Sequence, residues 1–175
     1  MLAPKHSVTR WLSLLVLALS VAGTVCVQGV EQDRGGQNSG ADLNAISSQF
    51  VGNYELVTYQ MFRRDGEVID LDYVGRIMYD EAGNMAAQGM PRDLPTRPRE
   101  RGQRLQGGFA YFGKFSVDLE KSVVVHHVVG SPTTGRWVGG DNVRYFEFKD
   151  GLLYLSLKSA DGRVTGTLSW RKLEN

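Results

Sequence analysis

The sequence predicts an all-β domain, a single up-and-down antiparallel β-barrel. Three observations lead to this fold class: short apolar segments, glycine-rich turn signals between them, and alternation of apolar and polar residues within them. The composition agrees, because 42% hydrophobic and 22% charged residues are ordinary for a globular domain, and 21 glycines are typical of frequent turns. A chain of 175 residues accommodates one such domain and a leader segment.

Turn signals divide the chain from residue 50 onward into strand-sized pieces. Asp-Gly, Ala-Gly-Asn and Asp-Gly-Arg sequences recur between apolar segments, and glycine or asparagine accepts the positive φ that tight hairpins need. The short connections predict that strands adjacent in sequence pair antiparallel. Strands are expected at residues 50–60, 67–71, 74–80, 84–90, 110–117, 122–129, 142–149, 152–158 and 163–172.

Alternation within these segments indicates that each strand buries one face. Arg144, Phe146 and Phe148 share a face, and three leucines two residues apart share a face of the next strand, 152–158. Closing such a sheet removes its exposed edges, and a barrel of about eight strands has room for one small ligand. A barrel or sandwich filled entirely by its own side chains is the alternative.

The N-terminal segment has the pattern of a Sec-type signal peptide, expected over residues 1–29. Lys5 and Arg10 precede an uncharged run, residues 11–30, that is rich in leucine, valine and alanine. The protein is therefore expected to be exported, to the periplasm or the outside of the cell. Because about 20 apolar residues also suffice to cross a bilayer, an uncleaved N-terminal membrane anchor is the alternative.

Two polar segments flank or interrupt the expected barrel domain, residues 48–175. Residues 30–47 are rich in glycine, serine and asparagine, and are expected to form a flexible linker. Residues 91–109 carry three prolines and five arginines, and a connection of this length in a compact barrel is usually functional or disordered. It is interpreted either as a short lid helix or loop whose arginines meet an anionic ligand, or as a solvated loop.

Several functional classes are excluded by composition and by the motifs present. The net charge is +1 and there is no basic stripe with interleaved aromatic residues, so nucleic acid is not an expected partner. The one cysteine, Cys26, lies in the leader, which excludes disulfides and cysteine-based metal sites in the barrel. The sequence lacks a nucleophile elbow, a phosphate-binding loop and a dinucleotide fingerprint. No cofactor and no metal are expected.

Short motifs follow one another along the barrel domain: Phe50-Val51-Gly52-Asn53-Tyr54-Glu55, Gly75-Arg76-Ile77-Met78-Tyr79, Ala110-Tyr111-Phe112-Gly113, His126-His127-Val128-Val129-Gly130, Trp137-Val138-Gly139 and Gly166-Thr167-Leu168-Ser169-Trp170-Arg171. The series resembles the lipocalin-like domain family of small bacterial and fungal barrels, over residues 48–173. The resemblance implies a calycin-type barrel with a ligand pocket. It also implies that Tyr54, in the place of the usual Trp, and Arg171 form a pair that closes the barrel.

Two adjacent histidines offer the most suggestive chemistry. Adjacent strand residues point to opposite faces, so only one of His126 and His127 faces the interior, and the two are not expected to share a zinc ion. His126 is preferred as the inward residue. Arg144 shares a face with Phe146, so it is either an inward cation that needs an anionic partner or a strand-end residue that reaches solvent.

The first functional hypothesis is a binding module for a small hydrophobic or amphipathic molecule, with an interior cavity of at least about 300 Å³. The expected ligand-binding residues are Tyr79, Gln88, Tyr111, His126, Trp137, Arg144 and Phe146. One alternative is an isomerase or cyclase that uses His126, Arg144 and Tyr111 as catalytic residues. The other is a protein-interaction platform that binds through Arg97, Arg99 and Arg101. A membrane is an expected partner only through an uncleaved leader.

Overall fold

The computed structural model describes residues 34–93, 96 and 107–174. The predicted leader and the arginines of the predicted lid from position 97 to 104 lie outside these residues. The described elements are α1 (Arg34–Phe50), β1 (Gly52–Phe62), β2 (Val68–Asp70), β3 (Tyr73–Tyr79), β4 (Asn84–Pro91), β5 (Phe109–Asp118), β6 (Val123–Gly130), the 3₁₀ turn η2 (Gly135–Trp137), β7 (Asp141–Lys149), β8 (Leu152–Lys158) and β9 (Val164–Lys172). No helix among the described residues is both long and apolar enough to cross a membrane.

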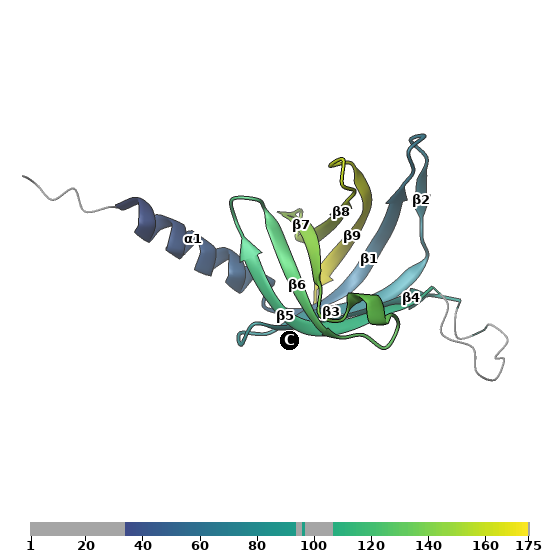
Figure 1. Ribbon diagram of the computed structural model, residues 1–175, viewed down its shortest axis with the longest axis horizontal. Coiled ribbons are helices and arrows are strands. Elements are labelled where there is room, and N and C mark those ends of the chain that lie inside the picture. Colours follow the sequence, from purple (N-terminus) through teal and green to yellow (C-terminus); the bar gives the residue numbers. More distant parts are fainter. Residues whose placement is uncertain (1–33, 94–95, 97–106, 175) are drawn as a thin grey trace, which may run out of the picture. The chain divides into compact units, whose positions relative to one another are not determined.

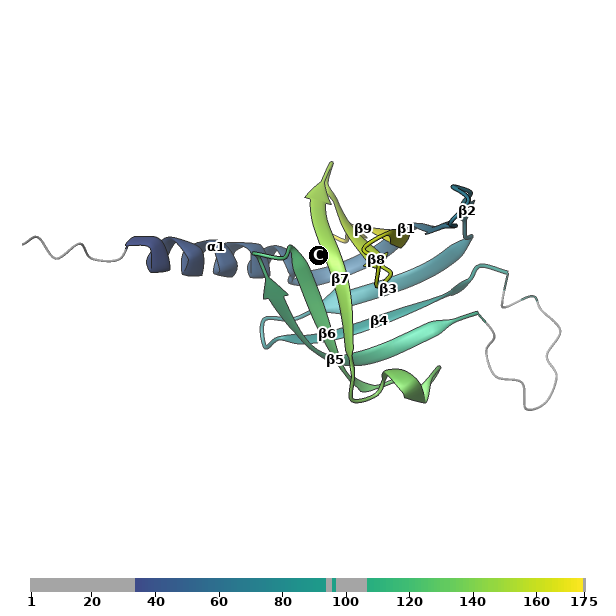
Figure 2. The ribbon, with the colours of Figure 1, turned by 45° about the horizontal axis from the view of Figure 1, so that its top comes forward.

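The nine described strands form one antiparallel sheet that closes on itself. The order is β2-β1-β3-β4-β5-β6-β7-β8-β9, and β1 also pairs with β9, so eight strands make a barrel and β2 is an extra strand at its edge. Figure 1 and Figure 2 both show β1 beside β9. The predicted fold class is confirmed, and each expected strand end lies within two residues of an observed one.

Alternation along the strands supplies the core, as the pattern predicted. In β8, Leu153 and Leu155 are 1% and 2% exposed, and in β9 Leu168 and Trp170 are similarly buried. Their neighbours in the chain point the other way, because successive strand residues face opposite sides of the sheet. The inward side chains of opposite walls therefore meet in the middle of the barrel.

Helix α1 corrects the expectation of a flexible linker over residues 30–47. Residues 34–50 are helical, and Ile46 and Phe50, four positions apart, lie on one side of the helix and pack against the barrel core. Phe50 is fully buried. These tertiary contacts stabilise a helix whose glycine, serine and asparagine content favours loops, which is why composition alone was misleading.

Phe50 is the centre of an aromatic cluster that fills one end of the barrel. Its ring lies 5.4 Å from Tyr79, 5.1 Å from Phe146 and 5.0 Å from Phe148, with edge-to-face geometry in each case. Such arrangements bring the positive edge of one ring to the negative face of another. The half of the interior beside α1 is therefore occupied by side chains.

The strands that close the barrel contradict the expected pairing of Tyr54 with Arg171. The register places Glu55 opposite Arg171 and Tyr54 opposite Lys172. Tyr54 points inward, and its hydroxyl donates to the Gln49 carbonyl at 2.6 Å, whereas Arg171 is exposed and lies 3.4 Å from Glu55. The expectation was wrong because residues one position out of register on paired strands face opposite sides of the sheet.

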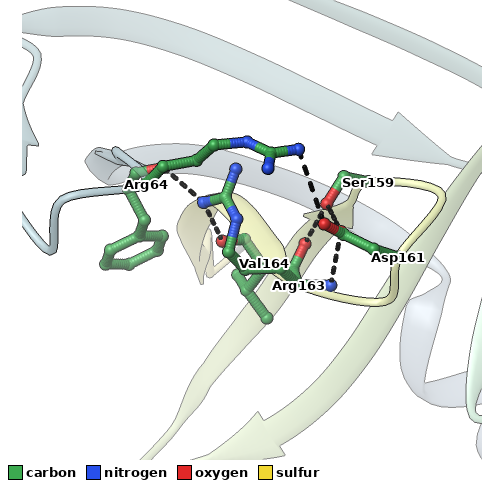
Figure 3. Close-up of polar contacts among 6 residues, drawn as sticks. Arg64, Ser159, Asp161, Arg163 and Val164 are labelled. Atoms are coloured by element: carbon green, nitrogen blue, oxygen red, sulfur yellow. Dashed lines mark hydrogen bonds and ion pairs between the residues drawn. The ribbon is translucent and has the colours of Figure 1, made fainter.

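The turn between β8 and β9 is fastened to the end of β1 at the barrel end away from Phe50. Arg163 donates from Nη1 to the Phe62 carbonyl at 2.9 Å, and Arg64 lies 3.5 Å from the carboxylate of Asp161 (Figure 3). The same carboxylate accepts from the Ser159 hydroxyl. This network links two turns that are about 100 residues apart in the chain, and so holds the barrel rim together on this side.

Candidate functional site

An interior cavity of about 110 Å³ lies among side chains from both walls of the barrel. Its aliphatic lining includes Ile77, Leu155 and Leu168. Its polar or aromatic lining consists of Tyr59, Phe109, Tyr111, Trp137, Arg144 and Trp170. The volume is smaller than the 300 Å³ that a binding barrel was expected to hold, because the cluster around Phe50 occupies the other end. For comparison, an apolar cavity of about 150 Å³ holds one benzene molecule.

His126 lies between two tyrosines behind the wall of this cavity. Its Nε2 is 2.8 Å from the Tyr79 hydroxyl and its Nδ1 is 2.9 Å from the Tyr111 hydroxyl. The imidazole is fully buried, and it does not line the cavity. Tyr111 does line it, so the histidine reaches the cavity through the Tyr111 hydroxyl.

The ionisation of these three groups is governed by burial. Burial, with smaller contributions from Arg144 and His127, holds the pKa of His126 well below its usual value, so the imidazole is neutral at pH 7. Burial likewise raises the pKa of Tyr79 well above its usual value. It also raises the pKa of Tyr111, against the lowering effect of Arg144. All three groups are therefore uncharged hydrogen-bonding partners.

Arg144 brings a positive charge to the cavity wall. It lies opposite Val124 in the β6–β7 register, and Val124 shares the inward face of β6 with His126. Its Nη1 donates to the Val143 carbonyl at 2.9 Å, and no ion pair to an acidic side chain is formed within the described part of the chain. Arg144 is thus an inward, half-buried cation without a carboxylate partner among these residues.

Trp170 contributes an unpaired hydrogen-bond donor. The residue is 1% exposed and lines the cavity, and its indole Nε1 finds no acceptor among the described residues. A buried indole N–H normally has a partner, so an orphaned one needs an explanation. Sequence reasoning did not assign Trp170 or Tyr59 to the cavity, although Trp170 stands two residues after Leu168 and therefore shares its face of β9.

The remaining expected binding residues are distributed over three places. Trp137, in η2, lines the cavity and lies 5.5 Å from the Tyr111 ring, edge to face. Phe146 faces inward but belongs to the cluster around Phe50 and does not line the cavity. Gln88 was wrongly assigned to the interior, because the odd-numbered residues of β4, such as Met85 and Ala87, are the buried ones, and Gln88 is exposed on the outer wall.

A second polar constellation, which the sequence did not predict, lies on the outer wall. Ser116 Oγ is 2.9 Å from His127 Nε2, and His127 Nδ1 is 2.7 Å from the Asp141 carboxylate. This is the order of contacts in a serine–histidine–aspartate triad. All three side chains are substantially exposed and none of them lines the interior cavity. Acyl transfer also needs oxyanion donors, and strand backbone amides here are used in the sheet.

No group of three histidine, cysteine, aspartate or glutamate side chains close enough to hold a metal ion occurs within residues 34–93, 96 and 107–174. The polar groups that line the cavity are instead an arginine, tyrosine hydroxyls and an indole N–H. These groups suit hydrogen bonding to an organic molecule or an anion rather than metal coordination.

Comparison with known proteins identifies the family of the chain. Residues 51–173 match the lipocalin-like domain family, and this range contains all nine described strands. A lipocalin-like protein from Bacteroides uniformis is similar at 18% sequence identity and a TM-score of 0.43, over 71% of this chain and 98% of that one. No curated protein matches. The resemblance inferred from the motifs is confirmed: the chain belongs to the lipocalin-like domain family.

Proposed function

We propose that this protein binds a small amphipathic molecule inside the barrel, with the polar end of the molecule at Arg144. A lipocalin-like barrel supports a binding role in general. The observation that carries the specific proposal is that Arg144 faces an interior cavity without an acidic partner in the described chain. A cation turned toward a low-dielectric interior is stabilised by an anionic partner, and the anionic end of a bound ligand would supply one.

The size of the cavity limits what enters it. A volume of about 110 Å³ accepts a group smaller than benzene. Trp137 and Arg144 are only half-buried, so this side of the cavity lies near solvent at the barrel end away from Phe50. The proposed ligand is therefore either a small molecule or one whose remaining part extends past Trp137.

A binding role is favoured over catalysis by His126. The imidazole is fully buried and is separated from the cavity by Tyr111, so it does not touch a molecule bound there. A general acid or base must come within hydrogen-bonding distance of the reacting group. His126 accordingly positions Tyr111 rather than exchanging protons with a substrate.

Two measurements test the proposal. Native mass spectrometry of the full protein purified from its own source is expected to show a co-purifying small molecule. Trp137 and Trp170, the two tryptophans among the described residues, both line the cavity, so their fluorescence emission is expected to shift when that molecule is extracted and returned.

The matched variants are Arg144→Gln and Arg171→Gln. Loss of the inward cation is expected to weaken binding at least tenfold, whereas loss of an exposed cation on the outer wall leaves it unchanged. Equal binding by both variants, or protein with neither bound molecule nor emission change, would count against the proposal.

Export belongs to the same proposal. Residues 1–29 act as a Sec-type signal, and the barrel works outside the cytoplasm. The basic residues and the uncharged run that follows them support this. The mass of the protein isolated from the producing cells is expected to correspond to a chain cut between residues 23 and 29. A full-length mass in the membrane fraction would indicate the uncleaved anchor instead.

A further inference from the structure

Tyr79, His126 and Tyr111 form a continuous hydrogen-bonded chain that ends at the cavity. The Tyr79 hydroxyl meets His126 Nε2 at 2.8 Å, and His126 Nδ1 meets the Tyr111 hydroxyl at 2.9 Å. Their exposed fractions are 3%, 0% and 6%, so water does not complete the bonding of the inner members. Of the three residues, only Tyr111 lines the cavity.

A neutral imidazole has one N–H donor and one nitrogen acceptor, so the chain runs in one of two directions. In the first, Tyr79 donates to Nε2 and Nδ1–H donates to Tyr111, which leaves the Tyr111 hydroxyl proton unused. In the second, Tyr111 donates to Nδ1 and Nε2–H donates to Tyr79, which leaves the Tyr79 hydroxyl proton unused. The two directions therefore differ in which tyrosine, Tyr111 or Tyr79, keeps a hydroxyl proton without an acceptor.

The Tyr79 hydroxyl has no second hydrogen-bond partner within the described residues, and it lies inside the core. The second direction would therefore strand a buried donor, which protein interiors avoid. The first direction leaves the free proton on Tyr111, whose side chain borders open space. A ligand in that space can accept it.

We propose that His126 carries its proton on Nδ1, so that the Tyr111 hydroxyl points a hydrogen-bond donor into the cavity. Together with Arg144 and the indole N–H of Trp170, this donor selects a carboxylate as the polar end of the ligand. This inference rests on the proposed binding function and specifies its chemistry. Arg144 and Trp170 have donors only, and Tyr111 is made a donor by His126. An ionised carboxylate accepts at both oxygens, whereas an ammonium group has no acceptor to offer.

The proton position is measured first, on the ligand-free full-length protein. Long-range ¹H–¹⁵N correlation spectra of the histidines distinguish a protonated Nδ1 from a protonated Nε2, and the His127→Gln variant identifies which signals belong to the outer histidine. A neutral His126 protonated at Nδ1 is expected. A neutral His126 protonated at Nε2 overturns the inference whether or not the barrel binds anything.

Ligand selection is measured with two probes. Butanoate is the carboxylate, part of which would extend past Trp137, and xenon is an apolar probe small enough to lie within the same cavity. Tyr111→Phe is expected to weaken butanoate about threefold to tenfold, the usual effect of one hydrogen bond, and to leave xenon binding unchanged. Tyr145→Phe, whose ring lies on the outer wall beside Lys158, is the matched control and is expected to change neither.

The outcomes separate the two proposals. Xenon binding without butanoate binding overturns the carboxylate inference and leaves a binding barrel. Butanoate binding that Tyr111→Phe does not weaken overturns the role of the Tyr111 hydroxyl. Failure of both probes to bind the wild-type protein overturns the proposed function and the inference that rests on it.

Discussion

His126 Nε2 and the hydroxyl of Tyr79 meet at 2.8 Å in the barrel interior, and neither side chain is more than 3% exposed. The two residues come from β6 and β3, which are not neighbours in the sheet. Their hydrogen bond therefore crosses the barrel interior rather than following a strand pair. The protonation of the His126 imidazole is therefore expected to affect the free energy of unfolding of the barrel.

Acidification is expected to destabilise the protein through His126. The pKa of His126 is held well below its ordinary value of 6.5 in the folded state, chiefly by burial. The unfolded chain therefore takes up a proton that the folded chain refuses as the pH falls below about 6.5. The free energy of unfolding is expected to decrease by up to about 1.4 kcal/mol per pH unit in that range.

Urea unfolding between about pH 7.5 and about pH 5.5 measures this slope. His126→Gln is expected to flatten it, and His127→Gln, which alters the exposed outer histidine, is expected to preserve it. Asp80, Asp118 and Asp161 have lowered pKa values, so stability that depends on them is lost only below their ordinary value of 3.8, outside this range. An unchanged slope in His126→Gln would show that another group is responsible.

Tyr79→Phe is expected to lower the free energy of unfolding by about 1–3 kcal/mol, because Nε2 of the buried imidazole loses the one hydrogen-bond partner that it has among the described residues. Tyr145→Phe removes a hydroxyl from the outer wall and is expected to change stability by less than about 0.5 kcal/mol. Chemical unfolding of both variants tests the difference, which vanishes if the crossing hydrogen bond contributes nothing.

Phe50→Ala is expected to destabilise the barrel by about 3–5 kcal/mol, since it empties the centre of an aromatic cluster. Leu43→Ala, at an exposed position of the same helix, is the control and is expected to have little effect. The midpoints of urea unfolding report both. A small effect of Phe50→Ala would mean that α1 does not contribute to the folded core in solution.

Gly113→Ala is expected to destabilise the protein by about 1–3 kcal/mol or more, because the added methyl would lie 1.9 Å from the His127 carbonyl oxygen. The site coincides with an irregular step in the β5–β6 pairing, where the strands approach closely. Gly135→Ala, with no atom within 4 Å of the new methyl, is the matched control. In thermal unfolding, Gly113→Ala is expected to have a clearly lower midpoint temperature than Gly135→Ala.

Much of the fold was predictable because β-strands carry a local signal. Glycine-containing turns and a two-residue alternation are set by neighbouring residues, and they located the ends of strands such as β7 and β8. The same alternation indicated that Arg144 shares a face with Phe146. The motif order added the family, which the match over residues 51–173 confirms.

Other features depend on residues that are far apart in the sequence. The pairing of β1 with β9 decided that Arg171 meets Glu55 and not Tyr54, and a shift of one residue would have reversed the outcome. Helix α1 was missed because its stabilising contacts are made by Phe50 with β3 and β7. Local propensity carries no information about such contacts.

The sequence by itself determined a lipocalin-like barrel and named His126, Arg144, Tyr111 and Trp137 as interior candidates. Only the tertiary structure decided their arrangement: a histidine held between two tyrosines, an arginine and an unpaired indole on one cavity, and a volume reduced by Phe50. The reason is physical. Which face a strand residue takes follows from its neighbours, whereas the depth of a side chain and its partners follow from how distant strands close around one space.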